Sequence, residues 1–386
     1  MGVNSFSIPR QIFYGENALS ELGNLKGKKA AIVTGGHSMK KFGFLDKAVE
    51  LLKNASIESI IIDGVEPNPS VNTVLSGAKK MEEFNPDWIV AIGGGSALDA
   101  AKVMWCFYEH PSLKFEDIIA VGSMPALRNK AKFIAIPSTS GTASEITAFS
   151  VITDPENHIK YPLVSGEMVP DIAILDPEIP SKMPAHITAN TGMDVMCHAL
   201  EALVSIARTN LTEPYAVRAI ELVKENLPVA YAEPNNLKAR ENMHEASCLA
   251  GMAFTNASLG LVHSLAHKIG GEFGVTHGLA NAILLPYVIA YNKQFTDRYT
   301  YIEALLGVED IAEVVRELNK SMNIPTCFKD CKEVDFNEAK FKEVIDRMSK
   351  NAFGDPCTLT NPGDPCVADV KMIYTAAYYG TDIVKR

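Results

Sequence analysis

The first half of the chain alternates short apolar runs with segments of helical periodicity. Each apolar run has the length of a strand and ends at a turn signal, as KAAIVT does at Gly35-Gly36 and WIVAI does at Gly93. Between these runs, apolar residues recur with the spacing of an amphipathic helix. Strands are predicted over residues 29–34, 57–63, 88–92, 132–136 and 171–175, and helices over 44–54, 71–84 and 96–108. This alternation predicts a mainly parallel, Rossmann-like sheet covered by helices.

The pattern changes near residue 185, beyond which no β-rich run occurs. Helical patterns cover residues 189–206, 214–225, 237–255, 262–272, 279–292, 310–322, 337–350 and 367–379. We therefore expect an α/β domain over residues 1–185 and an all-α domain over residues 186–386. The length of 386 residues suits two such domains.

Composition and charge exclude several classes of partner. The chain carries a net charge of −10, so it lacks the basic footprint of a protein that binds nucleic acid or an anionic membrane. No apolar stretch reaches the roughly 18 residues of a membrane span, and the first ten residues lack the apolar core of a secretory signal. Seven scattered cysteines indicate reduced thiols rather than a disulfide framework. These features predict a soluble cytoplasmic protein.

Two loops that follow predicted strands have the chemistry of a phosphate site. In IGGGSALDAAK, Gly94 and Gly95 lead into a helix that Ser96 is expected to cap, with Asp99 three residues later. The loop IPSTSGTASEIT offers many hydroxyl and N–H donors, Ser138 among them. The alternatives are a tight turn and a solvated loop, and neither a G-x-G-x-x-G nor a Walker A motif is present. Together the loops fit a nucleotide lying across the carboxyl ends of a parallel sheet.

The second domain contains histidines with the spacing of a metal site. Asp194 and His198 are one helical turn apart, and so are His263 and His267, while His277 follows the pair Gly270-Gly271, which we interpret as a helix break. A lone histidine in an apolar helix is usually a core residue, but several together favour coordination of a cation, since unpaired polar groups are costly to bury. A carboxylate with imidazoles suits iron, zinc, manganese or nickel. No C-x-x-C pair supports a cysteine site.

These motifs, in this order, resemble those of the iron-containing (group III) alcohol dehydrogenases. The resemblance covers GGGSALDAAK, PSTSGTASEIT, TGMDVMCHALEA, GLVHSLAHKIGGEFGVTHGLANAILLPYVI and DPCTLTNPGDP, and hence nearly the whole chain. It is strongest to the alcohol dehydrogenase part of bifunctional aldehyde–alcohol dehydrogenases and to stand-alone primary alcohol and propanediol dehydrogenases. It implies a dehydroquinate synthase-like architecture, in which the first domain binds a dinucleotide and the second binds metal and substrate. It also implies a homodimer or larger homo-oligomer.

The resemblance also assigns roles to individual residues. It implies that the metal ligands are Asp194, His198, His263 and His277, and that His267 is the histidine near substrate and nicotinamide. It places the cofactor pyrophosphate on Gly94, Gly95 and Ser96, beside Asp99. The remaining cofactor contacts that it implies are Asn68, Thr139, Thr142, Thr147, Phe149 and Lys160.

One departure from the family pattern bears on the choice of cofactor. Many NAD-preferring members have an Asp after the first strand, where this chain has Gly35 in VTGGHS. Loss of that carboxylate relieves repulsion against a 2′-phosphate, which Ser38, Lys40 or Lys41 would then bind. We therefore favour NADP(H) over NAD(H). The alternative is that the glycines only shape a turn and either cofactor binds.

The predicted function is reversible reduction of a small aldehyde to a primary alcohol by hydride transfer from NAD(P)H. The metal, with Fe²⁺ favoured and Zn²⁺, Mn²⁺ or Ni²⁺ as alternatives, would act as a Lewis acid on the carbonyl or alkoxide oxygen, and His267 would relay the proton. The alternatives are a glycerol- or propanediol-type polyol dehydrogenase of the same superfamily and a non-catalytic nucleotide-binding regulator. The sequence leaves the substrate open, and Phe149, Phe254 and Cys357 are candidates to line its pocket.

Overall fold

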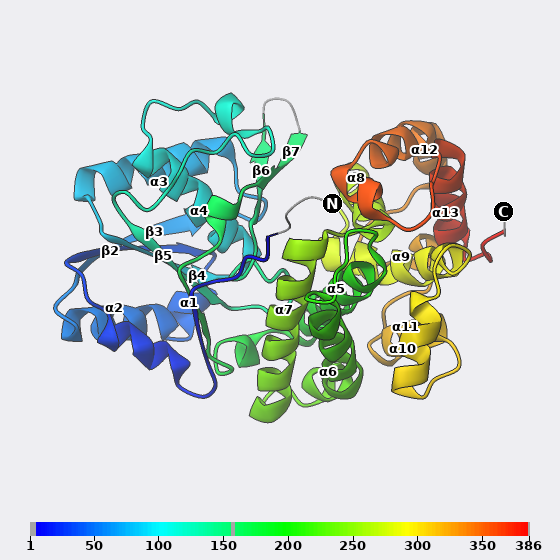
Figure 1. Cartoon of the computed structure of the whole chain (residues 1–386), viewed down its shortest axis with the longest axis horizontal. Helices are drawn as coiled ribbons and strands as arrows, with labels where there is room; N and C mark the ends of the chain where they lie inside the picture. The colour runs from blue at the N-terminus through cyan, green and yellow to red at the C-terminus, as the bar shows by residue number, and fades with distance from the viewer. Residues whose placement is uncertain (1–4, 156–158, 385–386) are drawn as a thin grey trace. The chain divides into compact units, whose positions relative to one another are not determined.

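The computed structural model describes residues 5–155 and 159–384, so the first four residues of the N-terminal segment considered above lie outside the described residues. The chain divides into two compact units, Met1–Met183 and Pro184–Arg386. The first is an α/β unit and the second is helical, which confirms the predicted fold class (Figure 1).

A six-stranded sheet forms the centre of the first unit. Its strands are β1 (Gln11–Tyr14), β2 (Lys29–Gly35), β3 (Glu58–Val65), β4 (Trp88–Gly93), β5 (Lys132–Pro137) and β8 (Ile172–Leu175), and their order in the sheet is β1-β8-β5-β4-β2-β3. Every neighbouring pair is parallel. Strand β1 was not predicted, because its four residues QIFY are only partly buried and do not form an apolar run.

Helices cover both faces of this sheet, which explains why its strands are almost continuously apolar. Ala31 and Val33 of β2 pack with α3 (Val71–Phe84) and α4 (Gly95–Glu109). Ala30 and Ile32 face the other way, onto α1 (Ser38–Lys41), α2 (Phe44–Asn54) and the 3-10 helix η1 (Ala18–Asn24). This alternation follows from the two-residue side-chain period of a strand. Figure 1 shows α3 and α4 on one side of the sheet and α2 on the other.

A two-stranded hairpin accompanies the sheet and was not predicted. Strand β6 (Phe149–Asp154) pairs antiparallel with β7 (Ile159–Val164), and β6 packs on α4. The strands carry polar residues and Pro162 among their apolar ones, so neither reads as an apolar run. The remaining short elements of this unit are η2 (Phe115–Ile118), η3 (Gly166–Met168) and η4 (Pro180–Lys182).

The strand order creates a switch point between β2 and β4. The chain leaves β2 for β3 on one side and then returns to place β4 on the other side. In such sheets the crevice at the carboxyl ends of the two central strands receives the ligand. Both glycine turns lie there, since Gly35 ends β2 and Gly93 ends β4, and a Cβ on Gly93 would lie 3.9 Å from the backbone nitrogen of Gly35.

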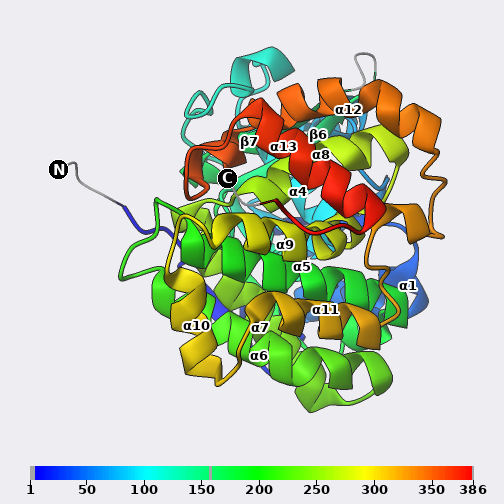
Figure 2. The same ribbon diagram turned by 90° about the vertical axis from the view of Figure 1, so that its right-hand side faces the viewer.

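The second unit is a bundle of helices around α9 (His277–Asn292). Helices α5 (Ala185–Val204), α8 (Leu261–Phe273), α11 (Ile311–Ser321) and α13 (Val367–Tyr379) all contact it. Figure 2 shows α13 and α8 on one side of α9 and α5 and α11 on the other. The unit is completed by α6 (Glu213–Ala232), α7 (Leu237–Ala257), α10 (Arg298–Leu306), α12 (Glu338–Phe353), η5 (Phe328–Asp330) and η6 (Pro356–Thr360).

Two local predictions in this unit were wrong. Gly270 and Gly271 do not break a helix, because α8 continues through them to Phe273 and ends where Gly274 adopts a left-handed conformation with φ of 74°. The next helix was predicted over 279–292 but begins two residues earlier, at His277, the first residue of α9. Among the described residues no single helix is long and apolar enough to cross a membrane, and only α7 and α8 together, bent by 102°, meet that criterion of length and composition.

Candidate metal centre and cofactor edge

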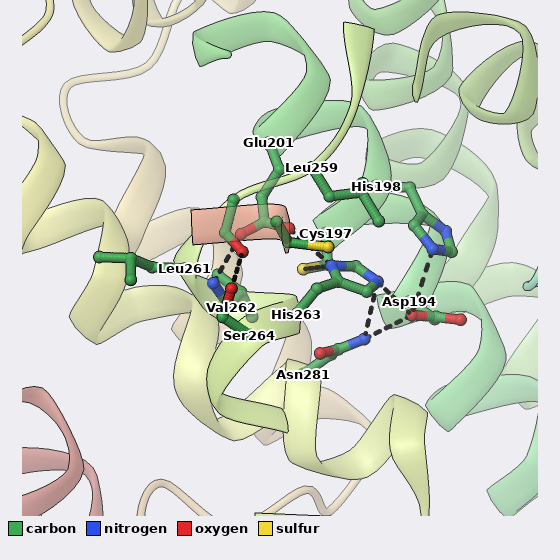
Figure 3. Close-up of polar contacts among 12 residues, drawn as sticks. Asp194, Cys197, His198, Glu201, Leu259, Leu261, Val262, His263, Ser264 and Asn281 are labelled. Carbon is green, nitrogen blue, oxygen red and sulfur yellow. Dashed lines mark hydrogen bonds and ion pairs between the residues drawn. The ribbon is translucent and has the colours of Figure 1, made fainter. Parts of the chain in front are cut away.

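Three helices of the second unit bring the predicted metal ligands together around one carboxylate oxygen. The Nε2 atoms of His198, His263 and His277 lie 3.8, 3.7 and 3.7 Å from Oδ1 of Asp194. Asp194 and His198 come from α5, His263 from α8 and His277 from the start of α9. Figure 3 shows Asp194 facing both His198 and His263. The ligand atoms of Asp194, His263 and His277 all lie within 4.8 Å of one another.

Three of the four residues are buried and the fourth is exposed. Asp194, His198 and His263 are at most 4% exposed, whereas the side chain of His277 is 41% exposed. Burial, together with the three neighbouring imidazoles, holds the pKa of His263 well below its usual value. His263 is therefore a neutral imidazole, which is the form that binds a metal.

Asn281 provides a test of whether the cluster suits a cation. Its Nδ2 lies 2.6 Å from Asp194 Oδ1, 3.1 Å from His277 Nε2 and 3.3 Å from His263 Nε2. One electropositive group thus meets three lone pairs, while the Oδ1 atom of the same buried amide has no hydrogen-bond partner among the described residues. A divalent ion about 2 Å from each ligand atom satisfies the same lone pairs with a full charge. The residues present therefore fit a divalent metal.

His267 lies beside this cluster and is held by an acidic residue distant in sequence. Its ring stacks on that of His277, with centroids 5.5 Å apart, and its Nδ1 lies 3.1 Å from Oδ2 of Asp355. The same oxygen accepts a hydrogen bond of 2.8 Å from Lys268. Burial disfavours the charged form of Asp355, but the hydrogen bond to His267 and the charges of His267 and Lys268 outweigh it and hold the pKa of Asp355 well below its usual range. His267 is 30% exposed, so it can exchange a proton with solvent.

Three residues of the site were not predicted from the sequence: Glu201, Asn281 and Asp355. Glu201 follows His198 by three residues and Asn281 follows His277 by four, so helical spacing from a suspected ligand would have found both. Asp355 lies 88 residues from His267, and no local pattern links them. Of the pocket candidates in this unit, Phe254 stacks on His198 with ring centroids 4.3 Å apart, and Cys357 lies in η6 and is partly buried.

In the first unit, the glycine turn and the Ser/Thr loop lie against each other at the carboxyl edge of the sheet. A Cβ on Gly95 would lie 2.8 Å from Cγ2 of Thr142, and one on Gly94 would lie 3.6 Å from Cγ2 of Thr139. The Ser138 N–H donates a hydrogen bond of 2.8 Å to the carbonyl of Gly93. Glycine is thus needed at position 95 by the close approach of the loop.

The expectation that Ser96 caps helix α4 was wrong. The helix begins at Gly95, and Gly94 is the N-cap, with no side chain bonded to the first turn. Asp99 is also not part of a capping box, because its carboxylate accepts hydrogen bonds from the Ser144 hydroxyl at 2.6 Å and the Val151 N–H at 2.9 Å. In the part of the chain that the structure describes, no side chain at the N-cap bonds to the first turn of α4, which suits the binding of an anion there.

A buried lysine holds two further cofactor candidates, Thr147 at the end of the Ser/Thr loop and Phe149 at the start of β6. Lys102 Nζ donates 2.8 Å hydrogen bonds to the carbonyls of Thr147 and Phe149. Burial lowers the pKa of Lys102 to about 8. Glu145, in the same loop, is 1% exposed, and neither of its carboxylate oxygens has a hydrogen-bond partner among the described residues. Burial raises the pKa of Glu145 to about 7.

Asn68 and Lys160 meet away from the glycine turn, where the hairpin joins the loop after β3. Lys160 Nζ donates a 2.8 Å hydrogen bond to Oδ1 of Asn68, which has a left-handed backbone with φ of 56°. Burial lowers the pKa of Lys160. The Thr153 N–H also donates to the carbonyl of Pro69, so strand β6 is attached to the same loop.

Gly35 has a structural reason to be glycine that the sequence does not reveal. A Cβ at this position would lie 2.6 Å from the carbonyl oxygen of Val65, at a register irregularity between β2 and β3. Any side chain at residue 35 would thus displace the backbone of β3. Ser38 follows as the first residue of α1 and is exposed, as are Lys40 and Lys41.

Comparisons with known proteins agree with this architecture. The family model described as iron-containing alcohol dehydrogenase matches residues 9–177, and that of the C-terminal region of the Fe-containing alcohol dehydrogenase family matches residues 188–378. The chain belongs to the iron-containing alcohol dehydrogenase family. It is therefore an oxidoreductase, and this family implies a divalent metal and NAD(P).

Individual relatives cover nearly the whole chain. It is 51% identical to an NADPH-dependent butanol dehydrogenase of Clostridium saccharobutylicum, over 98% of this chain and 99% of that one. It is 39% identical to an aldehyde-alcohol dehydrogenase of Streptococcus pneumoniae, covering 97% of this chain and 46% of the longer protein. The structure of an iron-containing alcohol dehydrogenase from Thermococcus thioreducens superposes with a TM-score of 0.90 at 36% identity, over 97% of this chain and all of that one.

Proposed function

We propose that the protein interconverts a small aldehyde and the corresponding primary alcohol, using NADP(H) and a divalent metal held by Asp194, His198, His263 and His277. The observation that carries this proposal is the convergence of three imidazole Nε2 atoms on Oδ1 of one buried carboxylate. Fe²⁺ is the favoured ion, with Zn²⁺, Mn²⁺ and Ni²⁺ as alternatives, because a carboxylate with imidazoles accepts all of them.

The bound metal would act as a Lewis acid that polarises the carbonyl oxygen of the aldehyde. The chain itself supplies one negative charge from Asp194 and neutral imidazole donors such as His263, and His277 leaves one side of the cluster accessible. His267 is the proposed proton relay. Asp355 fixes its ring through Nδ1, so that Nε2 is the nitrogen available for proton transfer.

The proposed cofactor site is the glycine turn with the Ser/Thr loop. The N–H groups at the start of α4, where no N-cap side chain bonds among the described residues, suit the pyrophosphate, as proposed for Gly94, Gly95 and Ser96. The preference for NADP(H) is supported by the NADPH dependence of the relative that is 51% identical and by the exposed Ser38, Lys40 and Lys41 beyond Gly35. We propose that the other cofactor candidates also contact the bound dinucleotide. They are Asn68, Asp99, Ser138, Thr139, Thr142, Thr147, Phe149 and Lys160.

The test is metal-dependent turnover in a matched pair of histidine variants. Metal-free protein is loaded anaerobically with Fe²⁺ or Zn²⁺, and oxidation of NADPH and of NADH is followed with butanal and other short aldehydes. His263→Ala is expected to weaken metal binding at least 100-fold and to abolish turnover, because it removes a buried ligand. His186→Ala, an exposed histidine in the first turn of α5, is expected to change neither.

Two results would contradict parts of this proposal separately. Normal metal content and turnover in His263→Ala would exclude the assigned ligand set. Faster turnover with NADH than with NADPH would leave the reaction class unchanged but reject the proposed cofactor preference.

A further inference from the structure

A buried carboxylate on α5 holds the opposite side of the His263 ring from the metal cluster. Glu201 is 2% exposed, and its Oε2 lies 2.6 Å from Nδ1 of His263. Its Oε1 accepts a 2.6 Å hydrogen bond from the N–H of Val262, in the first turn of α8. Figure 3 shows Glu201 and Asp194 on opposite sides of the His263 ring. One side chain thus contacts both the backbone and the imidazole of the adjacent helix.

The two nitrogens of His263 must differ if the ring is to bind a cation. A neutral imidazole carries one N–H, and only the other nitrogen has a lone pair for a metal. Nε2 faces Asp194 Oδ1 at 3.7 Å, so the proton has to reside on Nδ1. A proton on Nδ1 needs an acceptor, and Glu201 Oε2 is the nearest one. The thiol of Cys197, with Sγ 3.7 Å from Nδ1, is more distant and a weaker acceptor.

We propose that Glu201 is a positioning residue that fixes the Nδ1–H tautomer and the orientation of His263, so that the Nε2 lone pair points at the Asp194 cluster. This inference rests on the proposed metal centre. Glu201 contacts neither substrate nor the ligand atom itself, and acts through the ring that it holds. Carboxylates in this position raise metal affinity by fixing the tautomer and increasing ligand basicity.

A second cation site is the competing explanation for the same residues. Ligand atoms of Cys197, Glu201 and His263 all lie within 4.8 Å of one another. The contacts favour hydrogen bonding, because a 2.6 Å separation between Glu201 Oε2 and Nδ1 leaves no room for an ion between them and Oε1 already accepts the Val262 N–H. The two explanations differ in stoichiometry, since a second site would bind a second ion per chain.

Glu201→Gln separates tautomer control from the shape of the side chain. The Val262 N–H is fixed by the backbone, so the amide oxygen has to face it and the amide NH₂ has to face Nδ1. Nδ1 then becomes an acceptor and the proton moves to Nε2, the nitrogen that the metal needs. Glu303→Gln is the matched control. Glu303 is also a buried carboxylate of this unit, and its Oε1 accepts the N–H of Ile311 at the start of α11 and pairs with Lys293 Nζ at 2.6 Å instead of with a histidine.

The first measurement is the tautomer of His263 in metal-free protein, read from ¹⁵N shifts of labelled histidines and assigned with His263→Asn. The wild type and Glu303→Gln are expected to show Nδ1–H, and Glu201→Gln is expected to show Nε2–H. An Nε2–H tautomer in the wild type would overturn the proposal even if Glu201→Gln did not fold.

The second measurement is Zn²⁺ affinity and stoichiometry, by competition with a chelator. Glu201→Gln is expected to bind zinc about 10- to 100-fold more weakly, and Glu303→Gln and Cys197→Ala as tightly as the wild type. Unchanged zinc affinity in Glu201→Gln would reject the positioning role. Two ions per wild-type chain, reduced to one by Cys197→Ala, would establish the second site instead. Failure of the wild type to bind any metal would reject the proposed function. The tautomer measurement needs no metal, so it would still show whether Glu201 fixes the Nδ1–H form of His263.

Discussion

Asp194 is an acidic side chain in the middle of an apolar helix, and its neighbours explain how it is tolerated there. Three imidazole nitrogens and the Asn281 amide surround one of its oxygens. A buried charge without partners costs several kcal/mol, so a helix as apolar as α5 would not otherwise keep it. At the scale of the residue, the buried polar groups around Asp194 stabilise one another by their contacts. The lone pairs of the carboxylate and the imidazoles all face one point, where they suit a cation.

Glu145 is a buried carboxyl group whose oxygens have no hydrogen-bond partner among the described residues, and its pKa makes a testable prediction. Because burial raises the pKa to about 7 from 4.5, the folded chain retains a proton that the unfolded chain has released between these values. The stability of the wild type therefore falls as pH rises from 4.5 to 7. Glu145→Gln removes this loss and is expected to stabilise the protein by roughly 1–3 kcal/mol at pH 8, but little at pH 4.5. Urea unfolding at both pH values measures the difference.

Glu109→Gln is the control for this prediction, with the opposite expected sign. The Glu109 carboxylate accepts backbone N–H groups from Asn129, Lys130 and Ala131. Its replacement should cost about 1–3 kcal/mol at pH 8, because an amide cannot accept all of these bonds. An equal effect of Glu145→Gln at both pH values would show that its carboxyl group does not titrate in this way.

At the scale of the element, the segment Asp355–Asn361 supports helix α8 along its length. Asp355 bonds to His267 and Lys268, the Thr358 hydroxyl bonds to that of Ser264, and Asn361 Oδ1 accepts the N–H of Leu261. The helix that carries two of the predicted site histidines is thus fixed by a segment close to the C-terminus. The motif DPCTLTNP is therefore part of the support of the site, which the sequence analysis noted only as a family resemblance.

Close packing of α5 against α9 makes Gly278 a sensitive position. A Cβ on Gly278 would lie 2.2 Å from the carbonyl oxygen of Asn190 in α5. Gly278→Ala has to push the two helices apart beside His277, so we expect a loss of about 1–3 kcal/mol and weaker metal binding. Thermal unfolding and zinc titration measure the two effects.

Gly271→Ala serves as the comparison, because a Cβ at this position in α8 would meet no atom within 4 Å. Replacement of a helical glycine with open space around it is expected to stabilise the protein by roughly 0.5–1 kcal/mol. If Gly278→Ala were as stable as Gly271→Ala, the approach of α9 to the Asn190 carbonyl would leave room for a methyl group, and the prediction for Gly278 would be wrong.

At the scale of the whole molecule, the two sets of proposed site residues belong to different units. The proposed metal ligands all lie in Pro184–Arg386, and the proposed cofactor contacts all lie in Met1–Met183. Ligand binding protects the segments that it contacts from local opening. We therefore expect hydrogen exchange to slow in α5, α8 and α9 when Zn²⁺ binds, and in the 93–99 and 138–147 segments when NADPH binds.

His263→Ala tests whether these two responses are independent. It is expected to lose the protection by zinc and to keep the protection by NADPH in the first unit. Protection of the 93–99 segment by zinc alone would contradict the assignment of the metal to the second unit.

The sequence by itself determined the elements and part of the chemistry. The two-residue and 3.6-residue periods distinguish strands from helices, which was sufficient to predict the parallel sheet and the helical second unit. The same local rule placed Asp194 with His198 and His263 with His267. Periodicity did not predict the elements whose bounds depend on packing against neighbouring elements. These are β1, the hairpin of β6 and β7, the start of α4 and the course of α8 through Gly270-Gly271.

Only the tertiary structure decided which helical faces meet. Periodicity shows that a side chain is buried but not what it is buried against, since the partner lies far along the chain, as Asn281 does from Asp194 and Asp355 does from His267. The structure also showed that a side chain at Gly35 would collide with the Val65 carbonyl, so this glycine has a packing role whether or not it bears on the cofactor. Convergence on Asp194 Oδ1 and the hold of Glu201 on His263 are properties of three packed helices, and no single helix contains them.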